Sequence, residues 1–155
     1  MHFRNKLVLL ISTGFGVGKI PWAPGTFGSL LGLFLCALLA KLNIYLAGCL
    51  LVGFIIMAVR VSDRAAKLIK KEDPGCIVVD EIAGIMVTLI GFSFELRIAV
   101  VGFCLFRLLD IIKPPPIRTV EKRFTGGTGI VIDDVVAGLM AQGILRIIAV
   151  STDFF

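Results

Sequence analysis

The sequence predicts an all-α protein of one domain, residues 1–155, built as a multihelical bundle inside a membrane. Hydrophobic residues make up 57% of the chain, against roughly 45–50% apolar residues, glycine included, in ordinary globular domains. Charged residues still make up 17%, which is too many for helices buried in lipid throughout. We therefore expect an integral membrane protein whose charges gather at one level. A soluble helical protein with a very apolar core is the alternative.

The apolar segments predict the helices in chain order. The first, 7–11, follows Arg4 and Lys6 as in a signal peptide, but no small-x-small cleavage site comes after it, so we expect it to be retained. A span needs roughly 17–25 residues. Segment 130–150 is long enough to span, segment 44–59 is near the lower limit, and segment 30–40 is short. The later apolar segments are 30–40, 44–59, 77–94, 98–112 and 130–150.

The connections are rich in proline, glycine and basic residues. Residues 21–29, PWAPGTFGS, predict a stiff turn that ends at a helix start. Such a turn can offer backbone N–H groups and a hydroxyl to an anion, although a plain interhelix turn explains the same residues. The segments 60–71 and 113–123 are basic and are predicted to be loops. Lysine and arginine in short loops mark the cytoplasmic side of a membrane.

Two pairs of adjacent carboxylates stand inside apolar runs. Asp133–Asp134 lies in IVIDDVVAGLM and Asp80–Glu81 in IVVDEIAGIM, and the two stretches match if one residue is inserted. Adjacent carboxylates repel, and a hard divalent cation with oxygen ligands relieves that repulsion. Capping of a helix N-terminus is the alternative for either pair alone. Because capping does not require the same apolar lead-in and the same later glycine, the repeat favours one shared cation site.

Antiparallel alternation of the segments places the charged groups together. The acids start 77–94 and 130–150, whereas Arg107 and Asp110 end 98–112, on one helical face and just before Lys113. We therefore expect one site at the cytoplasmic edge of the membrane. A buried Arg107–Asp110 pair that only holds helices together remains the structural alternative.

Carboxylates with arginine and lysine side chains beside them favour a Mg²⁺ site that catalyses phosphoryl transfer or hydrolysis. The run from Gly14 to Lys19 is not a P-loop, because Thr13 and Ile20 stand where glycine and a hydroxyl residue are needed. No cysteine has an arginine six residues later, and His2, the sole histidine, stands at the chain start. The net charge of +5 suits an anionic membrane surface, since basic residues are not interleaved with aromatics as in a nucleic-acid site. No nucleic acid is expected as a partner.

Four blocks cover nearly the whole chain: APGTFGSL (23–30), IVVDEIAG (77–84), FRLLDIIKP (106–114) and GGTGIVIDDVVAG (126–138). Together, and in this order, they resemble the signature of the phosphatidylglycerophosphatase A family. The resemblance implies a multihelical all-α, Mg²⁺-dependent enzyme of the bacterial inner membrane. It would hydrolyse the phospholipid phosphatidylglycerophosphate to phosphatidylglycerol and phosphate, and the active site would face the cytoplasm.

Matching these blocks residue by residue implies the site. The expected metal ligands are Asp80, Glu81, Asp133 and Asp134. The expected catalytic residues are Asp80, Arg107, Asp110 and Asp134, and the expected substrate-binding residues are Lys19, Gly25, Thr26, Ser29, Arg107 and Lys113, with Asp73 and Arg118 as weaker candidates. An aspartyl-phosphate route remains open beside an activated water. A small transporter or channel subunit that binds a cation through the same acids is the rival function.

Overall fold

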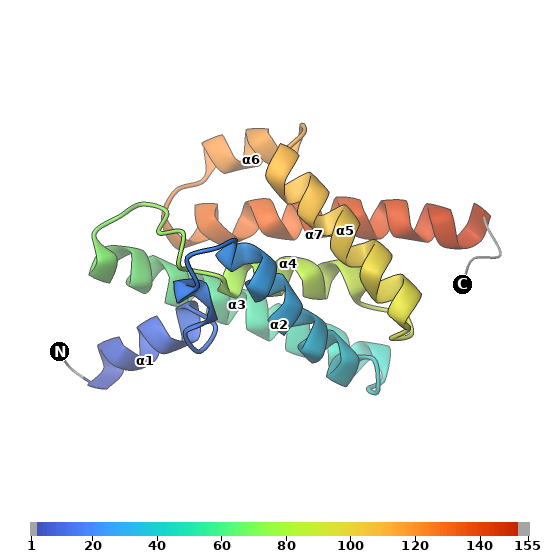
Figure 1. The fold of residues 1–155 in the computed structure, drawn as a ribbon, viewed down its shortest axis with the longest axis horizontal. Coiled ribbons are helices and arrows are strands. Elements are labelled where there is room, and N and C mark those ends of the chain that lie inside the picture. The colour runs from blue at the N-terminus through green and yellow to red at the C-terminus, as the bar shows by residue number, and fades with distance from the viewer. Residues whose placement is uncertain (1–2, 152–155) are drawn as a thin grey trace.

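The computed structural model describes residues 3–151, and within that range the chain is all helical, with seven α-helices, one 3₁₀ helix and no strand (Figure 1). The predicted all-α class is confirmed. His2 lies outside the described residues. The helices are α1 (Phe3–Ser12), η1 (Val17–Lys19), α2 (Pro24–Leu39), α3 (Ile44–Ile69), α4 (Val79–Leu89), α5 (Leu96–Ile112), α6 (Ile117–Arg123) and α7 (Gly126–Ser151).

The short helix α4 lies at the centre of the molecule. It packs against α2, α3, α5 and α7, and ten of its eleven residues are buried. Asp80 and Glu81 stand in its first turn, where negative charge is favourable to the helix dipole. At the other end, the Gln142 side chain of α7 donates a hydrogen bond of 2.8 Å to the carbonyl of Ile90. The two acids of α4 are therefore held by a helix that is buried in the core of the fold.

The basic segment 60–71 is mostly helical, so the predicted loop is wrong there. Helix α3 begins at Ile44, where Asn43 accepts a hydrogen bond from the Leu46 N–H, and it continues to Ile69. It continues because Ser62, Ala65 and Ala66 are buried at helical spacing while the basic residues between them face outward. The second basic segment likewise contains α6.

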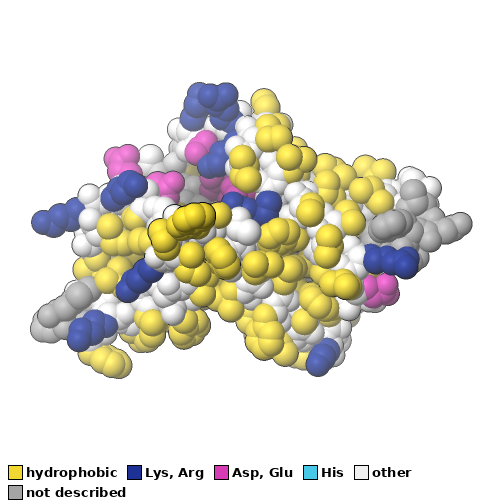
Figure 2. Space-filling model, viewed as in Figure 1, with side chains coloured by type: hydrophobic (Ala, Val, Ile, Leu, Met, Phe, Trp, Pro, Cys, Tyr) yellow, Lys and Arg dark blue, Asp and Glu magenta, His cyan; other side chains and the backbone are white. Residues whose placement is uncertain are grey.

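One helix in the described part of the chain, α3, is long and apolar enough to cross a membrane. Only 17% of its most apolar 18-residue window is buried inside the fold, so most of its apolar side chains lie on the surface of the molecule. Helix α2 is apolar but shorter. Hydrophobic side chains cover much of the face in Figure 2, whereas most acidic side chains visible there gather near α6 and the loops beside it.

Candidate active site

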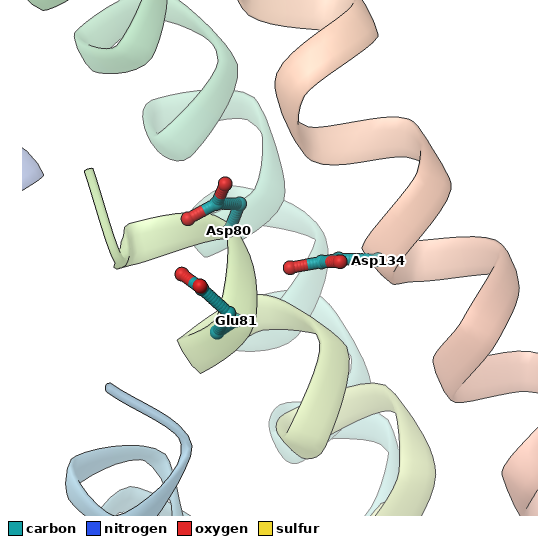
Figure 3. A group of neighbouring side chains, drawn as sticks. All are labelled: Asp80, Glu81 and Asp134. Carbon is teal, nitrogen blue, oxygen red and sulfur yellow. The ribbon is translucent and has the colours of Figure 1, made fainter. Parts of the chain in front are cut away.

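Three carboxylates converge where α4 and α7 cross. Asp80 and Glu81 come from the first turn of α4 and Asp134 from α7, and their side chains point toward one another (Figure 3). One oxygen of each lies within 4.8 Å of the others. Asp80 is 8% exposed and Asp134 is 4% exposed. The predicted convergence of acids distant in sequence is therefore confirmed, and the three residues are called the acid cluster below.

Two glycines bring the helices close enough for this convergence. A Cβ atom on Gly84 would lie 2.9 Å from the Asp134 carbonyl oxygen and would overlap the Phe106 ring. A Cβ atom on Gly138 would overlap the Gly84 carbonyl and lie 3.1 Å from Val87 Cβ. These are the glycines that follow the acids in the two matching stretches. The repeated pattern thus encodes a close helix crossing as well as a pair of acids.

The electrostatics of the acid cluster call for a cation. Burial, followed by the charges of Glu81 and Asp134, raises the pKa of Asp80 well above its usual value. Burial, followed by the charges of Asp110 and Glu81, does the same to the pKa of Asp134. Asp80 Oδ1 and Glu81 Oε2 are buried and have no hydrogen-bond partner. Orphaned carboxylate oxygens this close together fit a hard divalent cation such as Mg²⁺.

Helix α5 supplies a guanidinium beside the acids. Arg107 Nη1 donates a hydrogen bond of 2.6 Å to Asp110 Oδ2, one helical turn later, as predicted. A Cβ atom on Gly25 would lie 3.0 and 3.1 Å from the two terminal nitrogens of Arg107 and would overlap Glu81 Oε1. Gly25 is therefore where the start of α2 meets Arg107 and Glu81, and any larger residue would push them away.

Lys113 links the second aspartate of the α7 pair to the rest of the site. Its Nζ lies 2.6 Å from Asp133 Oδ2 and 2.7 Å from Glu121 Oε1. Burial lowers the pKa of Lys113, but the hydrogen bonds to Asp133 and Glu121 outweigh burial and raise it above its usual value. Burial raises the pKa of Asp133, against the opposing effect of Lys113. Asp133 thus lies beside the acid cluster, paired with a lysine, and its role as a metal ligand stays a prediction.

The capping alternative is wrong for the α7 pair. Helix α7 begins at Gly126, so Asp133 and Asp134 lie well inside it rather than at its N-terminus. The three glycines before them belong to the helix and not to a separate loop. Gly127 in particular packs against α3, where a Cβ atom would lie 2.6 Å from Asp63 Cβ.

A cavity of about 760 Å³ opens above the acid cluster. Asp73, a weaker candidate, also lines it. Six predicted residues do not line it. Gly25 and Arg107 lie beside Glu81 instead. Lys19 and Arg118 are exposed, Thr26 is half-buried, and the buried Ser29 hydroxyl donates to the Gly25 carbonyl at 2.8 Å within α2. The expected site residues that line the cavity are Asp73, Asp80, Glu81, Asp110, Lys113, Asp133 and Asp134.

Several lining residues are absent from the sequence-based site. Asp63 and Lys67 form an ion pair of 2.6 Å on α3, and Asp63 accepts a hydrogen bond from the backbone N–H of Gly127 at the start of α7. Lys70 and Lys71 at the end of α3 and Lys122 of α6 complete the basic side of the cavity. The buried small residues at helical spacing in 62–66 are the signal that would have placed these side chains on a helix.

The helical fold and the acid cluster define a helical protein whose buried carboxylate site fits a divalent cation, with an arginine and a lysine beside it. A family model described as phosphatidylglycerophosphatase A matches residues 10–149. The chain belongs to the phosphatidylglycerophosphatase A family, as the resemblance of the four blocks predicted, and it is a phosphatase. Family membership and the apolar helix α3 together indicate membrane association.

Three curated relatives show the extent of the similarity. The chain is 38% identical to phosphatidylglycerophosphatase A of Escherichia coli over 140 residues, which is 90% of this chain and 81% of the relative. It is 37% identical to phosphatidylglycerophosphatase A of Haemophilus influenzae over 139 residues, 85% and 82% of the two chains. A Bacteroides thetaiotaomicron protein provisionally named phosphatidylinositol-3-phosphatase is 36% identical over 147 residues, 90% and 91%. No solved structure matches significantly.

Proposed function

We propose that this protein is a Mg²⁺-dependent phosphatase that hydrolyses phosphatidylglycerophosphate to phosphatidylglycerol and phosphate. The observation that carries the proposal is the acid cluster at the base of the 760 Å³ cavity, with Arg107 and Lys113 beside it. The substrate follows from the names of the Escherichia coli and Haemophilus influenzae relatives.

Asp80, Glu81 and Asp134 are the residues that would hold Mg²⁺, and Asp133 stands next to them. The donor set fits, because it consists of carboxylate oxygens, some of them buried without any partner. When bound, Mg²⁺ supplies positive charge that offsets the carboxylates and draws electron density from a phosphoryl oxygen.

The remaining groups of the site suit hydrolysis of a phosphomonoester. Arg107 donates to phosphoryl oxygens and stabilises the negative charge that grows on them as the P–O bond to the alcohol breaks. Lys113, at the C-terminal end of the same helix as Arg107, adds a second positive charge. A water oxygen forms the new bond to phosphorus, one of its protons passes to a site carboxylate, and a proton returns to the departing glycerol oxygen. Asp110 and Asp134, which share a hydrogen bond, are the pair that we assign to this proton transfer.

The site is proposed to face the cytoplasm at the inner membrane, with the helices forming an integral bundle. The exposed apolar side chains of α2, α3 and α5 support this placement, as do the basic residues around the cavity. Charge gathered at one edge also argues against the transporter alternative, which needs its ion site near mid-depth. The family membership does not favour a transporter either.

Phosphate release from phosphatidylglycerophosphate in neutral detergent tests the proposal. We expect release with Mg²⁺, loss of release on adding EDTA and recovery on returning Mg²⁺. Phosphatidylinositol 3-phosphate is included as a second substrate because of the Bacteroides relative's name. The matched inactive control is Asp134→Asn, which keeps the side-chain shape and removes the charge. Folded wild-type protein that releases no phosphate with Mg²⁺ would overturn the proposed function.

A further inference from the structure

We propose that Lys70, Lys71 and Lys122 form a second anion subsite at the rim of the cavity, and that it binds the phosphodiester of the lipid substrate. This inference rests on the proposed function. The phosphomonoester would lie at the acid cluster while the phosphodiester, on its way to the lipid tails, would pass between the ends of α3 and α6. These three residues are called the lysine rim below.

The lysine rim differs from the other lysines of the cavity in having no partner. Five lysines line the cavity. Lys67 is paired with Asp63, and Lys113 is paired with Glu121 and Asp133. Within residues 3–151, the lysine rim makes no ion pair and no side-chain hydrogen bond. Three unpaired ammonium groups are thus available to an incoming anion.

The position of the lysine rim suits an anion held apart from the reacting phosphate. Lys70 ends α3 with a left-handed backbone, φ +60°, and Lys71 follows it on the exposed surface, whereas Lys122 comes from the last turn of α6. The acid cluster lies on α4 and α7 instead. In Figure 2, lysine and arginine side chains stand beside the acidic side chains at this end of the molecule. The two groups therefore line one cavity but belong to different helices.

The chemistry of the named substrates requires such a subsite. Phosphatidylglycerophosphate and phosphatidylinositol 3-phosphate each carry a phosphomonoester and a phosphodiester on one polyol. The P–O bond that is hydrolysed belongs to the phosphomonoester, and the phosphodiester is left intact. A phosphodiester keeps a single negative charge and has free oxygens that accept from lysine, which binds phosphate as a point charge. A cavity of about 760 Å³ has room for both phosphates and the polyol between them.

Acidic residues on the same rim allow a second test, in which removal of a negative charge should change substrate binding in the opposite direction. Glu72 and Asp73 follow the lysines, line the cavity and are exposed. They offset part of the positive charge, so three unpaired lysines face two rim acids. Removing the charge of Glu72 should therefore strengthen binding of a phosphodiester, opposite to removing a lysine.

Another explanation for the lysine rim is helix stabilisation, because lysines at helix C-termini interact favourably with the helix dipole. This explanation predicts that loss of the lysines affects all substrates alike. Binding of the lysines to a membrane surface is a third explanation, and it predicts an effect that requires anionic lipid. The experiment has to separate these three.

The test compares phosphatidylglycerophosphate with phosphatidic acid, a lipid phosphomonoester that lacks the phosphodiester between its lipid and a headgroup. Both are presented in neutral detergent micelles with Mg²⁺. For Lys70→Gln/Lys71→Gln/Lys122→Gln we expect kcat/KM on phosphatidylglycerophosphate to fall about tenfold or more, mainly through KM. Phosphatidic acid, measured as a substrate or as a competitive inhibitor, should change less than about twofold. Glu72→Gln should lower KM for phosphatidylglycerophosphate, and the control Lys41→Gln, in the turn between α2 and α3, should change nothing.

Three results would overturn the subsite. Equal losses on both lipids would assign the lysines to helix stability, a loss seen only in anionic vesicles would assign them to the membrane surface, and unchanged KM would remove any role. All three leave the proposed function standing, because wild-type turnover of phosphatidylglycerophosphate is measured in the same series. Absent wild-type turnover would instead overturn the proposed function itself.

Discussion

Lys113 Nζ lies 2.6 Å from Asp133 Oδ2 and 2.7 Å from Glu121 Oε1, so one ammonium group joins the end of α5 to both α6 and α7. Lys113 also ends α5 with a left-handed backbone, φ +47°. The contact fixes the helix that carries Arg107 against the helix that carries the aspartate pair. It makes Lys113 a structural residue of the candidate site as well as a proposed substrate-binding residue.

Lys113→Met should therefore destabilise the protein and impair turnover. The largely buried Asp133 would lose its counter-charge, at a cost of at least about 1–3 kcal/mol, because a buried charged group left without its partner costs more than a neutral one. Thermal unfolding in detergent measures the loss. Lys113→Met combined with Asp133→Asn should recover part of the stability, because the unpaired charge is gone; no recovery would show that the two side chains do not interact.

Asp134→Asn should lower the kcat of Mg²⁺-dependent turnover by about 100-fold or more, because charge stabilisation at the reacting phosphate is proposed to depend on this group. The folded state should not lose stability, since the substitution removes a buried carboxyl group whose ionised form is repelled by its neighbours. Unfolding curves with and without Mg²⁺ check this: wild-type protein should gain stability from Mg²⁺ and the variant should not. A variant that keeps both activity and the Mg²⁺ effect would show that the cation lies elsewhere.

Arg107→Lys should lower kcat/KM by about tenfold or more, although the positive charge is kept. The guanidinium donates to Asp110 while its nitrogens lie against Gly25, a planar arrangement that a single ammonium does not reproduce. Steady-state kinetics with circular dichroism as a folding control measures the effect. Wild-type kinetics in the lysine variant would reduce Arg107 to a simple charge.

Gly138→Ala should separate α4 from α7, with a loss of about 1–3 kcal/mol of stability and a loss of activity. The added Cβ would overlap the Gly84 carbonyl. Gly143→Ala is the matched control on the same helix, because nothing lies within 4 Å of its added Cβ. It should be neutral or stabilising through helix propensity. Equal behaviour of the two variants would contradict the close crossing.

The effect of Mg²⁺ on stability should grow as pH rises. The pKa values of Asp80 and Asp134 are raised in the fold, so the folded protein without Mg²⁺ holds protons that the unfolded chain releases at its lower, ordinary pKa. Above that ordinary pKa, stability falls with rising pH until the folded acids also ionise. Mg²⁺ binding displaces these protons and removes the cost. Melting temperatures with and without Mg²⁺ from pH 5.5 to 8 should diverge upward; a constant difference would contradict proton-coupled binding.

Sequence reasoning predicted that the acids, Arg107 and Lys113 lie near one another, and the structure brings them together. The prediction was possible because these residues lie in apolar helices whose alternating directions set their level. It missed the extent of α3, since a count of basic residues at 60–71 outweighed the buried periodicity of Ser62 and Ala65. Helix ends are set by such packing as much as by composition.

The separate surroundings of Asp133 and Asp134 were also beyond sequence reasoning. Neighbours on a helix point in directions about 100° apart, so one aspartate turns to the acid cluster and the other to Lys113. The rotation of α7 about its axis relative to α4 decides which of the two aspartates joins the acid cluster and which pairs with Lys113. The lysine rim was missed for a related reason, because free and paired lysines look alike in a sequence.

The central helix α4 is buried at ten of its eleven positions, so it should tolerate fewer substitutions than the exposed ends of α3 and α6. A substitution at one of these buried positions disturbs the packing of α4 against its neighbouring helices, so the proposed metal site is tied to a helix that tolerates little change. The ends of α3 and α6 carry no such burden and can change one side chain at a time. Under the proposed roles, substitutions at the ends of α3 and α6 would change headgroup preference and leave the acid cluster intact.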